Sequence, residues 1–197
     1  MVDLRGVIYA LNNNLKLFTQ MKSPRNPLLE YPGQIVLKSV TDPRMNHNQG
    51  FVLSLNDDLA KAWWTMRTFC LLASMRAQTR VLLPPAMIYG TLVAVMCRGL
   101  YMKFATGPPD ETMRRGLLVF TSHISLQWQD IRPPLRGILL AYDQSLRNRT
   151  YNSGLVPSDT IVWLLMIGAV STFNISEEDW SRDSLLKQFD TCQIMAW

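Results

Sequence analysis

The stretch that decides the fold is DTIVWLLMIGAV at residues 159–170, which is apolar after its first two positions apart from one glycine. Ser158 or Asp159 at its start is a residue type that caps helices, because its side-chain oxygen accepts a hydrogen bond from a free backbone N–H of the first turn. The stretch therefore predicts a buried helix that reaches about Phe173, with Trp163 as a core anchor. It is shorter than the ~20 apolar residues that a membrane span needs.

Similar boundary signals divide most of the chain into helices, since prolines, asparagines and acidic residues stand where helical spacing of apolar residues begins. Strand-like alternation occurs only at residues 34–40 and 50–55. The sequence therefore predicts an all-α fold, in which residues 1–197 form one compact helical bundle of seven to eight helices and residues 25–60 are the least defined part. The helices are expected at residues 3–21, 57–78, 85–104, 110–129, 135–149 and 159–173, and a last one begins in the acidic run at residues 176–179.

The helix expected at residues 85–104 is apolar on almost every side. A helix with this pattern is typical of the centre of a fold. Its neighbours along the chain are the helices expected at residues 57–78 and 110–129. A pocket, if the fold has one, is expected between these three helices.

Composition excludes some classes of function. Apolar residues make up 48% of the chain, which indicates a folded domain. The first hundred residues hold eleven Lys/Arg and five Asp/Glu, and the remainder holds nine and ten, but the basic residues of the first half stand singly. Direct nucleic-acid binding is therefore not expected. The eleven methionines and six tryptophans suit either a helical core or a pliable pocket for an apolar ligand.

Metal and cofactor sites are not expected. The three cysteines, Cys70, Cys97 and Cys192, fit neither a zinc nor a redox spacing. The two histidines, His47 and His123, have no partners at metal-ligand spacing. Sparse cysteines and an N-terminus without an apolar leader favour an intracellular location, in the nucleus or the cytoplasm.

No catalytic motif stands out, so the candidate site residues come from the expected central helix and its neighbour. Arg98 is the strongest candidate, because a charged side chain in so apolar a helix must pair with an opposite charge or reach solvent. The other candidates for an acid–base or binding role are Tyr89, Thr91, Tyr101 and His123. For each of them, a structural or surface role is the competing interpretation.

The order of segments in the second half resembles the C-terminal part of the fungal-specific transcription factor domain, the helical regulatory region of zinc-cluster regulators. In that family a helix with a charged start carries small residues and leucines, a leucine-bearing helix follows, and then an apolar segment with a central tryptophan and a glycine. The matching segments here are MRRGLLVF at 113–120, LRGILL at 135–140, WLLMIGA at 163–169 and Trp180, and VDLRGV at 2–7 resembles the family's mid-domain helix.

The departures from this family bear on function. Three cysteines cannot form its six-cysteine zinc cluster, and no coiled-coil heptads precede Asp3. The chain is thus expected to be a fragment or a stand-alone relative without DNA binding of its own. The resemblance implies a regulatory domain that acts by protein contact or by sensing an apolar metabolite.

Two other classes of function remain open at this point. One is a small helical enzyme of secondary metabolism, of cyclase or isomerase type, derived from the same scaffold, since shape-selective catalysis needs little beyond positioning. The other is a purely structural interaction module. The expected partner is a hydrophobic small molecule or a protein. Association into a homo-oligomer is a further alternative.

Overall fold

The computed structural model describes residues 49–79, 83–104, 109–127, 136–147, 156–171 and 183–188. Within these ranges the chain is helical and contains no strand, which confirms the expected all-α domain. The expected helix at residues 3–21, the alternation at 34–40, His47, the acidic run at 176–179 and Cys192 lie outside the described residues. The helices are α3 (Gln49–Ser54), α4 (Asp57–Thr79), α5 (Pro85–Tyr101), α6 (Pro109–Gln127), α7 (Arg136–Arg147) and α8 (Ser158–Ser171), and residues 183–188 are also helical.

The strand-like alternation at residues 50–55 does not produce a strand, because most of this segment is the helix α3. Its apolar residues Phe51, Val52 and Leu55 are buried on one side of the helix and the following turn. The Ser54 hydroxyl donates a 2.7 Å hydrogen bond to the Phe51 carbonyl oxygen within this helix. Six residues are too few to distinguish the helical period of 3.6 residues from the strand period of two. Here the packing of the apolar side against the core favours the helix.

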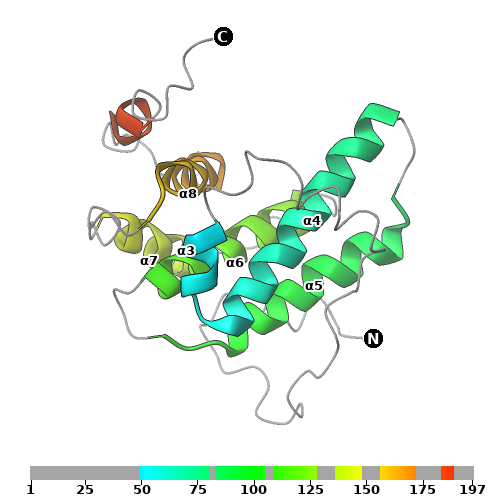
Figure 1. The fold of residues 1–197 in the computed structure, drawn as a ribbon, viewed down its shortest axis with the longest axis horizontal. Coiled ribbons are helices and arrows are strands. Elements are labelled where there is room, and N and C mark those ends of the chain that lie inside the picture. Colours follow the sequence, from blue (N-terminus) through cyan, green and yellow to red (C-terminus); the bar gives the residue numbers. More distant parts are fainter. Residues whose placement is uncertain are drawn as a thin grey trace.

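The start of α4 is fixed by polar groups. The Asn56 side-chain oxygen accepts a 3.0 Å hydrogen bond from the Asp58 backbone N–H, as a helix cap does. The Asn56 backbone N–H donates a 2.9 Å hydrogen bond to Asp110 of α6, so the starts of the two helices are joined. This confirms that the acidic pair at positions 57 and 58 begins a helix. From there α4 runs beside α5, as Figure 1 shows.

The helix with the most packing partners is α6, which lies against α4, α5, α7 and α8, whereas α5 packs mainly against α4 and α6 (Figure 1). One side of α5 is deeply buried and includes Thr91 and Leu92, while Tyr89 and Tyr101 on the same helix are exposed. Thus only one side of α5 packs in the core, although its sequence is apolar on almost every side. The side chains of the core recur at helical spacing, as in Leu59, Ala62, Met66 and Phe69 of α4 and Ile138, Tyr142 and Leu146 of α7.

Three helices are tied together by a buried ion cluster at the start of α6. The carboxylate of Glu111 accepts hydrogen bonds from the side chains of Arg114, at 2.6 and 2.7 Å, and Arg115, at 2.7 Å. Arg114 also donates to the Gly99 carbonyl oxygen of α5, and Arg115 to the Ala141 carbonyl oxygen of α7. Burial alone would raise the pKa of Glu111, but the two arginines lower it overall. The two adjacent arginines of this helix therefore have a packing role.

Small residues let α6, α7 and α8 approach closely around one aromatic ring. Tyr142 of α7 is fully buried, and its hydroxyl donates a 2.7 Å hydrogen bond to the Leu164 carbonyl oxygen of α8. A β-carbon at Gly116 would lie 2.7 Å from the Leu164 side chain and 3.5 Å from the Tyr142 ring. At Gly168 it would lie 3.3 Å from Leu146 and 3.8 Å from Tyr142. Gly116 therefore permits the close packing of α6 against α8.

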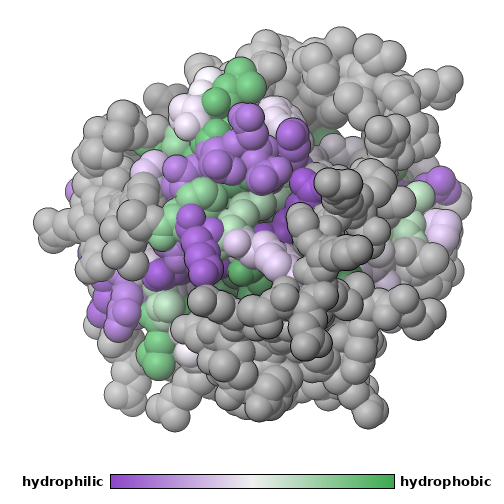
Figure 2. Space-filling view, turned by 90° about the horizontal axis from the view of Figure 1, so that it is seen from below, coloured by the Kyte–Doolittle hydropathy of each residue, from purple (hydrophilic) through white to green (hydrophobic). Residues whose placement is uncertain are grey.

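The surface of the described part mixes polar and apolar side chains. On the face shown in Figure 2, hydrophobic areas lie between hydrophilic side chains. Large hydrophobic residues that are exposed come from several helices, for example Leu53 of α3, Leu140 of α7 and Met166 of α8. Across the described ranges, no helix combines the length and the apolar character that a bilayer crossing requires.

Candidate functional site

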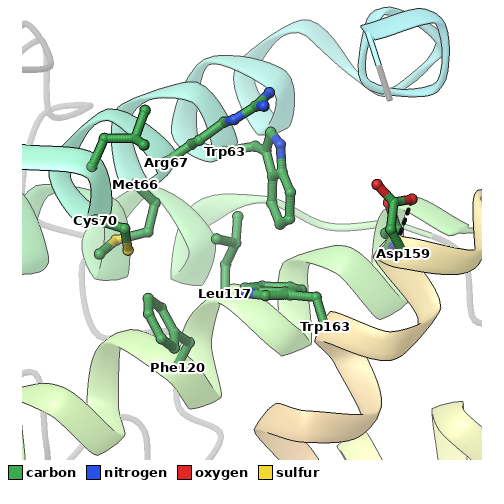
Figure 3. Close-up of a pocket in the computed structure, with 10 residues that line it drawn as sticks. Trp63, Met66, Arg67, Cys70, Leu117, Phe120, Asp159 and Trp163 are labelled. Carbon is green, nitrogen blue, oxygen red and sulfur yellow. Dashed lines mark hydrogen bonds between the residues drawn. The ribbon is translucent and has the colours of Figure 1, made fainter. Parts of the chain in front are cut away.

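A pocket of about 360 Å³ lies between α4, α6 and α8 (Figure 3). This volume is within the usual range of small-molecule sites. The lining is mostly apolar or aromatic, with one cation and one carboxylate. It consists of Trp63, Met66, Arg67, Cys70 and Leu71 from α4, Leu117 and Phe120 from α6, and Asp159, Thr160 and Trp163 from α8.

Helical spacing explains why these side chains share one cavity. The α4 residues Trp63, Met66, Arg67 and Cys70 are spaced at i, i+3, i+4 and i+7, which places them on one face of the helix. The contributions of α6 are also one turn apart. Those of α8 fall in its first two turns. Each helix therefore presents one side to the pocket and another side to the core.

Three aromatic rings form a corner of the pocket. The indole rings of Trp63 and Trp163 meet edge to face, with centroids 4.6 Å apart and planes at 86°. The Phe120 ring lies 5.9 Å from the Trp163 ring at 60°. Such edge-to-face contacts are favourable because the positive edge of one ring meets the negative face of another. In Figure 3, Trp63 extends from α4 toward Trp163, and Leu117 and Phe120 extend from α6.

Two charged side chains also line the pocket. The guanidinium carbon of Arg67 lies 5.0 Å from the centroid of the Trp64 ring, one turn back on α4, which is a cation–π distance. Asp159 stands in the first turn of α8, where the helix N-terminus favours a negative charge. Its Oδ1 atom accepts a 2.9 Å hydrogen bond from the Thr160 backbone N–H. Both charges therefore have structural partners in addition to their place at the pocket.

Two other polar atoms of pocket residues are buried without a hydrogen-bond partner. They are the indole Nε1 of Trp63 and the hydroxyl oxygen of Thr160, a residue only 2% exposed. A buried polar atom that makes no hydrogen bond costs folding free energy, on the order of 1–3 kcal/mol. Native proteins contain few such atoms. A third such atom among the described residues, Oε1 of Gln188, lies outside the pocket lining.

Cys70 is not poised as a nucleophile. The residue is exposed, but it stands on a concave, largely apolar wall. Burial by the surrounding protein raises the pKa of the Cys70 thiol to about 11. Because the thiolate is the reactive form, the neutral thiol that dominates at pH 7 behaves as a small apolar group. It therefore adds to the apolar lining.

The five residues expected to carry a site do not line this pocket. Arg98 forms an ion pair with Asp58 of α4, with 3.8 Å between nitrogen and oxygen, which is one of the two outcomes expected for a charge in this apolar helix. Thr91 is fully buried, and its hydroxyl donates a 2.8 Å hydrogen bond to the Met87 carbonyl oxygen of its own helix. Both residues thus have a structural explanation.

The remaining three candidates lie on α5 and α6, away from the pocket lining. Tyr89 and Tyr101 are exposed on α5. Partial burial, and then the charge of the nearby Cys97, raise the pKa of Tyr101. His123 is half-buried on α6, and burial lowers its pKa, which favours the neutral imidazole. A catalytic role for these residues stays a prediction.

Among the residues that the structure describes, no group of three or more His, Cys, Asp or Glu side chains is close enough to hold a metal ion. The pocket itself presents one carboxylate and one neutral thiol. The rest of its lining is mainly apolar or aromatic.

The pocket residues were partly visible in the sequence. Trp163 was expected to be a core anchor. In the structure Trp163 is half-buried, because one side packs against the core and another lines the pocket. The i, i+3, i+4, i+7 spacing in α4 was the available signal. It does not reveal by itself which partner helix the face meets.

The chain was compared with known protein families, with curated proteins and with solved structures, and none of the three comparisons gave a match. The resemblance to the fungal regulatory region therefore remains a prediction from sequence. The geometry of the pocket is the observation on which a function can be built.

Proposed function

We propose that this protein is a helical regulatory domain that binds an apolar, aromatic small molecule between α4, α6 and α8. The observation that carries the proposal is the aromatic corner of Trp63, Phe120 and Trp163 in a pocket of about 360 Å³. Apolar pockets with a few polar groups are the usual form of small-molecule sites. Met66 at the same wall has a flexible side chain that adapts to the shape of an occupant.

The regulatory part of the proposal rests on the resemblance in sequence. In this interpretation the ligand contacts both α4 and α8 and strengthens their association. A partner protein senses this change by direct contact, and the domain itself does not bind DNA. A ligand that binds only the folded form stabilises it by mass action. Ligand binding would then make α8 associate more tightly with the rest of the domain.

The test is equilibrium dialysis of the purified protein against small neutral aromatic compounds, such as 2-acetylnaphthalene. Cys70→Phe fills the pocket wall with a larger side chain at an exposed position, and binding should fall at least tenfold. Met75→Phe is the matched control, because Met75 is exposed on the same helix and does not line the pocket. Equal loss of binding in both variants, or no binding by the wild type, would refute the proposed site.

A further inference from the structure

The two unpartnered polar atoms indicate which ligand the pocket recognises. We infer that the occupant is an uncharged aromatic or conjugated compound with a carbonyl-type oxygen, and that this oxygen accepts a hydrogen bond from the indole N–H of Trp63. The inference rests on the proposed function, and it adds the chemical class of the ligand. It starts from the fact that Trp63 Nε1 is buried and has no hydrogen-bond partner.

The direction of recognition follows from the chemistry of indole. The nitrogen of a tryptophan side chain only donates, so it can be satisfied only by an acceptor. In Figure 3 the nitrogen edge of Trp63 is on the side of Asp159, at the N-terminal end of α8. Protein atoms cover the nitrogen, so the indole must turn about its side-chain bonds before a ligand oxygen in this part of the pocket can meet the N–H. The hydrogen bond then removes a cost that the protein bears without it.

Thr160 provides the second, independent observation. Its hydroxyl oxygen is buried without a partner in the first turn of α8, beside Asp159. A hydroxyl both donates and accepts, so it adapts to whichever polar group the ligand places there. The pocket lining thus combines the aromatic corner with two polar atoms that lack hydrogen-bond partners, one on Trp63 and one on Thr160.

The neighbouring charges explain why the ligand is uncharged. Arg67 and Asp159 both line the pocket, so a ligand cation or anion would meet one opposite and one like charge. The Asp159 carboxylate is already engaged with the backbone of α8, and the Arg67 guanidinium is placed over the Trp64 ring. A charged ligand would also lose its hydration in a mostly apolar cavity. A neutral carbonyl avoids both penalties.

The experiment compares two probes of nearly equal shape, 2-acetylnaphthalene and 2-ethylnaphthalene, which differ in whether the side group carries an oxygen. The wild type should bind the acetyl compound about fivefold more tightly, as expected for one net hydrogen bond. In Trp63→Phe, which keeps an aromatic ring but lacks the N–H, the two affinities should become equal within twofold. Trp64→Phe is the matched control, because Trp64 does not line the pocket, and it should keep the fivefold preference.

A measurement on the unaltered protein covers the case in which Trp63→Phe folds poorly. One of the six tryptophan indole N–H proton resonances should move downfield on addition of 2-acetylnaphthalene and not on addition of 2-ethylnaphthalene. Equal affinities and equal shifts for both probes would overturn the inference and leave the proposed function standing. If neither probe binds, both the inference and the proposed function are overturned.

Discussion

The indole of Trp63 on α4 meets the indole of Trp163 on α8 edge to face, with ring centroids 4.6 Å apart. The two residues are far apart in the chain, so this contact joins the helical pair of α4 and α5 to α8. Both rings also line the pocket. One contact therefore contributes to the stability of the fold and to the shape of the candidate site.

Trp163→Ala should destabilise the protein. The ring is half-buried and loses its contacts with Trp63 and Phe120, so the expected loss is about 2–4 kcal/mol, near the lower part of the range for buried aromatic residues. Denaturant unfolding measures it. Met166→Ala on the exposed side of the same helix is the control and should change stability by less than about 0.5 kcal/mol. Equal stability of wild type and Trp163→Ala would contradict the packing described here.

Gly116→Ala tests the close approach of α6 and α8. The new methyl group would lie 2.7 Å from the buried Leu164 side chain, so overpacking of about 1–3 kcal/mol should exceed the gain of about 1 kcal/mol in helix propensity. A lower melting temperature is the expected result. At Gly50 a β-carbon meets nothing within 4 Å, so Gly50→Ala should leave the melting temperature unchanged or slightly higher. A Gly116→Ala protein as stable as Gly50→Ala would show that α8 does not pack this closely.

Glu111→Gln should destabilise the protein at pH 7, because it leaves Arg114 and Arg115 without their counter-charge. Removal of one partner of a buried ion cluster typically costs about 3–5 kcal/mol, and partial exposure of the arginines reduces this to about 2–4 kcal/mol. Asp143→Asn, in the more exposed pair with Arg147, is the control and should cost less than about 1 kcal/mol.

The same variant should change the response to acid. The pKa of Glu111 is lower in the folded protein than its ordinary value of 4.5, so the unfolded chain binds the proton more tightly. Its contribution to stability is therefore complete above pH 4.5 and is lost as the pH falls below that value. Unfolding curves of the wild type should shift more steeply between pH 5 and 3 than those of Glu111→Gln. Parallel pH profiles would argue against the ion cluster.

Cys70 should react slowly with iodoacetamide. Because its pKa is raised to about 11, the thiolate fraction keeps increasing throughout the range from pH 7 to pH 10. In a Cys192→Ser background, the alkylation rate of Cys70 should rise about tenfold for each pH unit without a plateau. A plateau near pH 8 or 9 would place the thiol in a well-hydrated environment, at odds with its position on the pocket wall.

Local signals predicted the helices well. The expected helix at residues 57–78 corresponds to Asp57–Thr79 of α4, and that at 110–129 to Pro109–Gln127 of α6. Acidic residues, asparagine and proline act on the turn in which they stand, so such boundaries can be inferred from sequence. The short helix α3 was not predicted, because six residues contain too few periods to separate helical from strand-like spacing.

The pocket was harder to predict because it depends on which helix faces meet. The apolar character of α5 suggested a cavity beside that helix, and Arg98 and His123 were selected on that basis. In the structure α6 has more packing partners, and the described pocket opens on its α8 side. A β-carbon at Gly116 would lie 3.4 Å from the Trp163 ring, so the position of that ring depends on how closely α6 and α8 pack. No local pattern in α4 specifies that arrangement.

The central claim, that an apolar aromatic ligand binds between α4, α6 and α8, is tested most directly by locating a bound probe. With methionine methyl groups labelled with carbon-13, intermolecular nuclear Overhauser effects should connect the ring protons of 2-acetylnaphthalene to the Met66 methyl group in the pocket wall. Met75, exposed on the same helix outside the pocket, should show none. Effects that reach Met75 or the exposed Met166 but not Met66 would place the probe on the surface and contradict the account.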